Sequence, residues 1–194
     1  MTISLRIEKL AQKISTNCRA IDPKSVDAFL DSIVSANRIF VAGAGRSGLA
    51  VKAFGMRLMH LGFTVFVVGE VITPAIRKGD LLIVVSGSGK TTSMLNIITA
   101  SKSKNANVVA ITSYTDSPIA LASDHIVQIK GRILDDLAPD YGPRQILGGH
   151  EAMTPLGTLF ELSAMLFFDA SIEELMLRYK KSEEEMKEYH TNLE

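Results

Sequence analysis

Two short segments of the sequence combine glycine with hydroxyl side chains, and each directly follows an apolar run. The first is Gly43-Ala-Gly-Arg-Ser-Gly48, and the second is Ser86-Gly-Ser-Gly-Lys-Thr91. Glycine lets the backbone approach a ligand closely, and the free N–H groups at the start of a helix attract anions. Serine and threonine hydroxyls add further donors. Together the two segments predict a binding site for a phosphate group.

The predicted phosphate site draws residues from both segments. Turns that follow neighbouring strands of one parallel sheet converge on the crevice at its carboxyl edge, where such folds bind ligands. Arg46 would supply a positive charge there, and the hydroxyl and glycine residues would supply hydrogen-bond donors. The predicted set is Arg46, Ser47, Ser86, Gly87, Ser88 and Thr91.

Each turn also resembles a nucleotide-binding motif. Gly43-x-Gly45-x-x-Gly48 matches the dinucleotide fingerprint, with Glu70 near the place of a ribose-binding acid. The sequence after the fifth apolar run is too short for a substrate domain, however, and the second turn has no role in that fingerprint. Dinucleotide binding therefore stays as a minor alternative. A P-loop is disfavoured, because Val84 occupies the position of its first glycine.

Three titratable side chains can be interpreted from their positions in the sequence. Glu161 lies in an otherwise apolar helical stretch, where partial burial would suit a general base; the alternative is a carboxylate that caps or pairs with a neighbour. His60 ends a helical stretch, where an imidazolium would also interact favourably with the helix dipole. His190 lies in a polar tail and, on sequence alone, is typical of a surface histidine.

Composition excludes several classes of protein. The chain has 194 residues, 46% of them hydrophobic, and 21 basic residues balance 21 acidic ones, so it lacks the charge of a nucleic-acid-binding protein. Its one cysteine, Cys18, and the absence of a signal-like or membrane-spanning apolar run predict a cytoplasmic protein without membrane contact. His150-Glu151 lacks the second histidine of a helical zinc motif, so no metal is predicted.

The elements that would position these residues follow an alternating pattern. Short β-branched runs alternate with helical patterns, which predicts a three-layer α/β sandwich with a five-stranded parallel sheet of the flavodoxin-like, doubly wound type. The expected strands are 38–42, 63–68, 81–85, 107–112 and 125–129. Met56, Met59, Met153 and Met165 fall on apolar stretches and are expected in the core.

We expect a single domain that spans residues 1–194. Its parts are N-terminal helices (1–36), an α/β core (37–130), a loop (131–153) and C-terminal helices with a tail (154–194). A loop of this length inside a compact domain is typically functional or disordered. Glu151 within it is a second carboxylate candidate for the site.

The two turns resemble the phosphate-binding turns of SIS domains, which occur in sugar-phosphate isomerases and in sugar-phosphate-sensing regulators. Within that group, further segments are similar to the 6-phospho-3-hexuloisomerases: 53–63, 68–74, 155–161 and 190–194. The likeness covers nearly the whole chain. Two features depart from it: many members carry glutamate where this chain has Lys90, and the 131–153 segment is the least similar part.

The resemblance implies an isomerase that interconverts D-arabino-hex-3-ulose 6-phosphate and fructose 6-phosphate through an enediol(ate), a step of the ribulose monophosphate pathway of formaldehyde assimilation. Glu161 would move the proton, and His60 and His190 would assist, the latter by reaching a neighbouring subunit's site. No cofactor is implied. The implied partners are a sugar phosphate and further copies of the chain, with a homotetramer favoured over a dimer. The alternatives are another isomerase, such as one for arabinose 5-phosphate, and a non-catalytic sugar-phosphate-binding module.

Overall fold

The computed structural model describes residues 2–131 and 157–190. In these ranges it contains one sheet of five parallel strands in the order β2-β1-β3-β4-β5, as the sequence predicts for the fold class. The strands are β1 (Ile39–Gly43), β2 (Val65–Val67), β3 (Leu81–Val85), β4 (Asn107–Thr112) and β5 (His125–Gln128). The strand predicted at 63–68 is shorter than expected, and the other four match within one residue.

The helices of the described residues are α1 (Ile3–Arg19), α2 (Pro23–Ser35), α3 (Gly45–His60), α4 (Thr92–Lys102), α5 (Pro118–Leu121), α7 (Thr158–Tyr179) and α8 (Glu183–Glu188). Local signals start several of them: the Asp22 side chain caps α2, and Ser182 with Glu185 forms a capping box on α8. The predicted start of the C-terminal helix at 154–155, the 132–153 part of the predicted loop and Glu151 lie outside the described residues.

Successive side chains of the central strands point to opposite faces of the sheet and therefore pack into two separate hydrophobic cores. On β1 and β3, Val41 and Ile83 join the core beneath α2, α3 and α7, whereas Phe40 and Leu82 join the core beneath α4 and α5. Both sets are almost fully buried. This two-sided burial explains why the strands read as continuous apolar runs.

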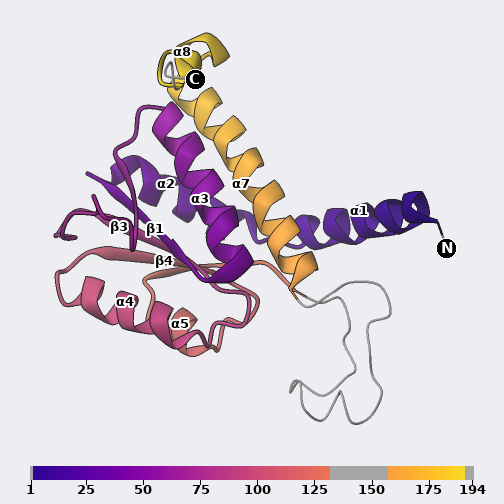
Figure 1. The fold of residues 1–194 in the computed structure, drawn as a ribbon, viewed down its shortest axis with the longest axis horizontal. Coiled ribbons are helices and arrows are strands. Elements are labelled where there is room, and N and C mark those ends of the chain that lie inside the picture. Colours follow the sequence, from indigo (N-terminus) through magenta and orange to yellow (C-terminus); the bar gives the residue numbers. More distant parts are fainter. Residues whose placement is uncertain (1, 132–156, 191–194) are drawn as a thin grey trace.

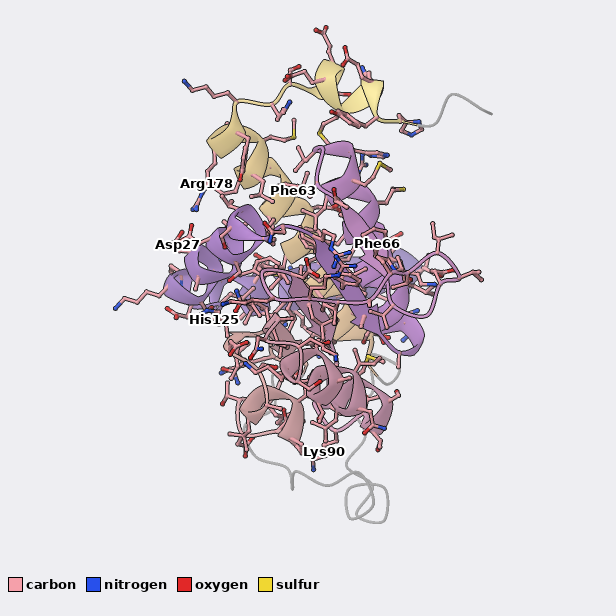
Figure 2. All side chains as sticks on the ribbon, turned by 90° about the vertical axis from the view of Figure 1, so that its left-hand side faces the viewer. Asp27, Phe63, Phe66, Lys90, His125 and Arg178 are labelled. Carbon is pink, nitrogen blue, oxygen red and sulfur yellow. The ribbon has the colours of Figure 1, made fainter. Side chains whose placement is uncertain are left out.

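Figure 1 shows the resulting layers, with α4 and α5 on one face of the sheet and α2, α3 and α7 on the other. The apolar side chains of α7, among them Phe168 and Leu175, are buried within the chain's own core. Arg178 ties the far end of α7 to Asp27 of α2 at 2.8 Å (Figure 2). Helix α1 extends away from the sheet, and most of its residues are exposed.

Candidate functional site

The two glycine-rich turns leave the sheet side by side. Gly43 and Val85 are partners in the β1–β3 register, so the turns that follow them start from adjacent strand ends. Helix α3 begins in the first turn and α4 directly after the second, and neither has an acidic residue in its first turn. Because β1 and β3 lie at the point where the strand order reverses, this is the crevice in which flavodoxin-like sheets bind ligands.

The hydroxyl groups of the second turn form a compact cluster. Ser86 Oγ lies 3.0 Å from Thr91 Oγ1, and the backbone N–H of Lys90 donates to Ser88 Oγ over 3.3 Å. Ser86 is buried and Ser88 is exposed, so the cluster runs from the sheet edge to the surface. The side chain of Lys90 points outward from the body of the protein (Figure 2).

Close packing requires glycine at one position in each turn. A Cβ on Gly48 would lie 2.5 Å from the carbonyl oxygen of Gly43. Gly89 has φ +63°, and a Cβ there would lie 2.0 Å from Ser117 Oγ. Ser117, the N-cap of α5, is a residue of the site region that the sequence interpretation missed; the Ser-Pro pair at 117–118 is the signal that would have predicted this helix start.

Glu161 lies at the mouth of the first turn, where its carboxylate forms an ion pair with the Nε group of Arg46. The pair joins the first turn of α7 to the first turn of α3. The Glu161 side chain is 14% exposed, so the partial burial expected from the sequence is confirmed. Arg46 therefore contacts the candidate base as well as lying where a phosphate counter-charge was predicted.

His60 and His190 lie together, but not at this place. Their ring centroids are 5.2 Å apart, at the end of α3 that faces α8. Arg46 and His60 sit near opposite ends of α3, about 21 Å apart at the ordinary helical rise. In Figure 1, α8 lies at one end of α3 and the start of α7 at the other. Within one chain, the structure does not bring the two histidines to Glu161.

The environment of His60 opposes the protonated form that the helix-dipole argument favours. Its side chain is buried, with the residue 5% exposed. Burial lowers the pKa of His60, and the nearby His190 and Arg57 lower it further. Burial and the neighbouring His190 and Arg57 therefore act against the protonated form that the helix dipole would favour.

This shift predicts a pH-dependent contribution to stability. Below the ordinary histidine pKa of about 6.5 the unfolded chain takes up a proton at His60 that the folded protein does not, so the free energy of unfolding decreases as the pH falls through that value. Urea titrations at pH 7 and pH 5 should show a smaller loss for His60→Gln than for the wild type. His125→Gln, which changes an exposed histidine, is the control and should keep the wild-type loss. Equal losses in all three proteins would contradict the prediction.

Other features concern dinucleotide binding, metal binding and membrane contact. Glu70, the candidate ribose-binding acid, pairs with Lys52 of α3 at 2.7 Å, so its carboxylate already has a cationic partner. In residues 2–131 and 157–190, no three His, Cys, Asp or Glu side chains form a group that could hold a metal ion. None of the helices in this part of the chain combines the length and the apolar character needed to cross a membrane.

Two hydroxyl- and glycine-rich turns, with a carboxylate beside them, lie at the switch point of a doubly wound α/β sheet, which is where proteins of this fold class bind small ligands. The SIS domain model matches residues 32–133, which contain both turns. The chain belongs to the SIS-domain family.

Relatives cover nearly the full length of the chain. It is 37% identical to the 3-hexulose-6-phosphate isomerase of Bacillus subtilis, with 97% of each chain covered. It is 36% identical to the enzyme of that name from Methylomonas aminofaciens, covering 98% of this chain and 97% of the relative. A solved structure from Methanococcus jannaschii, for which the function of a 3-hexulose-6-phosphate isomerase was inferred, superposes with a TM-score of 0.79 at 32% identity, covering 97% of this chain and 98% of that one.

Proposed function

We propose that this protein is a 6-phospho-3-hexuloisomerase, which interconverts D-arabino-hex-3-ulose 6-phosphate and D-fructose 6-phosphate. One observation carries the proposal beyond phosphate binding: Glu161 stands between the two turns. Its carboxylate pairs with Arg46 of the first turn, and the ring of its neighbour Phe160 packs on Gly87 of the second. A carboxylate in this place can reach the carbons of a sugar whose phosphate is held by the turns. The names of the full-length relatives support the same activity.

The reaction moves a carbonyl group from C3 to C2. Glu161 takes the proton from C2, which carries a hydroxyl group, and the electrons of that C–H bond form the C2=C3 bond of an enediol(ate) while the C3 carbonyl oxygen takes up the negative charge. The same carboxyl group returns the proton to C3. A proton passes from the C2 oxygen to the C3 oxygen, which leaves the carbonyl at C2. The substrate carbonyl accepts the electrons, so the step is balanced without a cofactor.

A coupled assay of fructose 6-phosphate formation from hex-3-ulose 6-phosphate tests the proposal, with arabinose 5-phosphate assayed in parallel. The proposed isomerase turns over the hexulose substrate and leaves the pentose phosphate unchanged. Turnover of arabinose 5-phosphate alone would assign the chain to the neighbouring isomerase class. Binding of both sugars without turnover would indicate a sensor. Activity on hexulose 6-phosphate would also support a role in formaldehyde assimilation by the ribulose monophosphate pathway; a cytoplasmic location stays a prediction.

Ser88→Ala should raise the Michaelis constant about tenfold, because a hydrogen bond to a charged group contributes ~1.5–3 kcal/mol. The inhibition constant of inorganic phosphate should rise with it. Ser88 is exposed in the second turn, so the change should leave the fold intact. Ser103→Ala, at the other end of α4, is the matched control and should leave both constants unchanged. If Ser88→Ala behaves like this control, the phosphate binds elsewhere.

We also propose that the enzyme is a homo-oligomer, with a dimer through α3 as its unit. Three large apolar side chains on α3 are uncovered: Leu49 is 67% exposed, Met56 48% and Met59 38%. The sequence-based expectation that Met56 and Met59 lie in the core was wrong; Met165 is partly buried against the core. Val71 and Ile72 are also exposed, in the loop that Glu70 ties to α3. A stripe of this kind favours contact with another copy of the chain.

A twofold axis at this stripe would place the histidines of one chain near Glu161 of the other. The exposed residues spread over both halves of α3, and small Ala53 lies near its middle. An antiparallel pairing of two α3 helices centred there would bring the end of one, with His60 and His190, beside the start of the other, with Arg46 and Glu161. The predicted participation of both histidines is thus compatible with their distance within one chain. A second interface of a different kind would extend the dimer to the tetramer favoured by the sequence resemblance.

A further inference from the structure

The first turn of α7 contacts both phosphate-binding turns. Glu161 pairs with Arg46, and the Phe160 ring packs so closely that a Cβ on Gly87 would lie 2.9 Å from it. Phe160 is itself buried. The placement of this single helical turn therefore sets where the carboxylate stands relative to the bound phosphate.

The helix does not secure its own start through a side-chain cap. Its N-cap is Gly157, with φ +81°, which has no side chain to accept the first N–H groups. A side-chain cap contributes about 1 kcal/mol to a helix start. The position of the first turn of α7 must then come from contacts with other parts of the chain.

One such contact is made by Asn17, near the end of α1. The side chain is buried, with the residue 4% exposed. Its Nδ2 group donates to Ser163 Oγ over 2.9 Å and to the backbone carbonyl of Lys130 over 2.5 Å. Ser163 follows Glu161 by two residues, and Lys130 lies just beyond β5. A single carboxamide thus ties α1, the exit of the last strand and the start of α7.

We infer that Asn17 is a positioning residue, which holds the first turn of α7 in the place where Glu161 can act on substrate; the inference rests on the proposed function. Packing alone does not explain an amide at this position, because Asn17 Oδ1 is buried and has no hydrogen-bond partner among the described residues. An unpaired buried acceptor destabilises a fold, whereas an apolar side chain in the same place would avoid that loss. The hydrogen bonds that Asn17 donates to Ser163 and Lys130 explain why an amide occupies this position.

Asn17→Ala should reduce kcat about 10- to 100-fold, because a displacement of about 1 Å at the reacting groups can lower a rate a hundredfold. The Michaelis constant should change less than about threefold, since the turns that bind phosphate keep their own strands and helices. Gln12→Ala is the matched control: it removes an exposed amide from α1 whose side-chain bond is to Glu8, and it should leave both constants unchanged.

A double-mutant cycle with Glu161→Gln separates positioning from general structure. If Asn17 acts through Glu161, then Asn17→Ala reduces kcat in the wild-type background and has little effect in the Glu161→Gln background. Equal fold-losses in both backgrounds, or a wild-type kcat with only a lower melting temperature, would overturn the inference. Wild-type turnover of Glu161→Gln alone would overturn the proposed function instead, so the two failures are distinguishable.

Ser163→Ala keeps the test decisive if Asn17→Ala does not fold. It removes one acceptor of the Asn17 amide and should lower kcat in the same direction by a smaller factor. Ser171→Ala is its control, because in the part of the chain that the structure describes this buried hydroxyl donates to the carbonyl of Phe167 in its own helix. Equal kcat values for the two serine variants would contradict the positioning role.

Discussion

Glu161→Gln should lower kcat by ~10²–10⁴ and leave the Michaelis constant nearly unchanged, because the amide cannot accept the proton from C2. The phosphate turns bind the ground state and the transition state alike, so their contribution to affinity survives. The loss of the ion pair with Arg46 leaves that guanidinium free to meet the phosphate. The variant should also stop exchanging the C2 hydrogen of the substrate with solvent deuterium, which can be followed by NMR.

The control for this variant is Glu173→Gln, an exposed carboxylate on the same helix, which should keep wild-type turnover and exchange. A structural role for Glu161 would give a different pattern: a less stable variant whose folded fraction exchanges normally. Folded Glu161→Gln protein with wild-type turnover would exclude Glu161 as the base. Glu151 would then be the carboxylate to test.

Two inactive variants should restore activity when they are mixed, if each site is built from two chains. Glu161→Gln and His190→Ala should each be nearly inactive, since each lacks a proton-transfer group. A mixed dimer holds one site with Glu161 from one chain and His190 from the other, both intact. Random exchange of subunits by unfolding and refolding together should then recover about a quarter of the wild-type activity. His190 suits this test because it is exposed, so its replacement should leave folding unaffected.

The matched control mixes Glu161→Gln with Arg46→Ala. These residues pair within one chain, so no mixed dimer contains an intact site, and the activity should stay low. Recovery in the first mixture but not in the second would establish that the histidine comes from the partner chain. No recovery in either would mean that His190 serves the site of its own chain or none. Sedimentation of an active 21.1 kDa monomer would exclude the shared site altogether.

Much of the fold could be predicted because the sheet is buried on both faces. The run 81–85 is apolar at every position and the run 107–112 at its four central positions, and the structure gives strands with those same bounds. The bounds of the short edge strand at 65–67 were harder to predict. Its side chains are only half-buried, and the run 63–68 around it extends beyond the strand at both ends. Helix α5 was missed because its four residues are too few to show a helical period.

The turns that form the candidate site could be predicted from the sequence, but the contacts between distant side chains in it could not. The turn segments carry their own signal in glycine and hydroxyl residues. The pairing of Arg46 with Glu161 joins positions 115 residues apart, and no local pattern reports it. The burial of His60, which lowers its pKa, could not be predicted for the related reason that burial by distant segments leaves no mark in the local sequence. Met56 and Met59 were misplaced because an apolar stripe that stays exposed has the same composition as one that packs into the core.

The carboxylate and the phosphate turns come from different stretches of the chain. The stretch that matches the SIS domain model, residues 32–133, ends before α7 begins at Thr158. In the proposed assignment, the turns of the sheet bind the phosphate and helix α7 carries the base. On this assignment, a related protein without the acid at position 161 would still bind phosphate esters and could act as a receptor. A related protein with the acid at another position of α7 would act on a different carbon of the sugar. Such an architecture can diversify its reactions without rebuilding the surface that recognises the ligand.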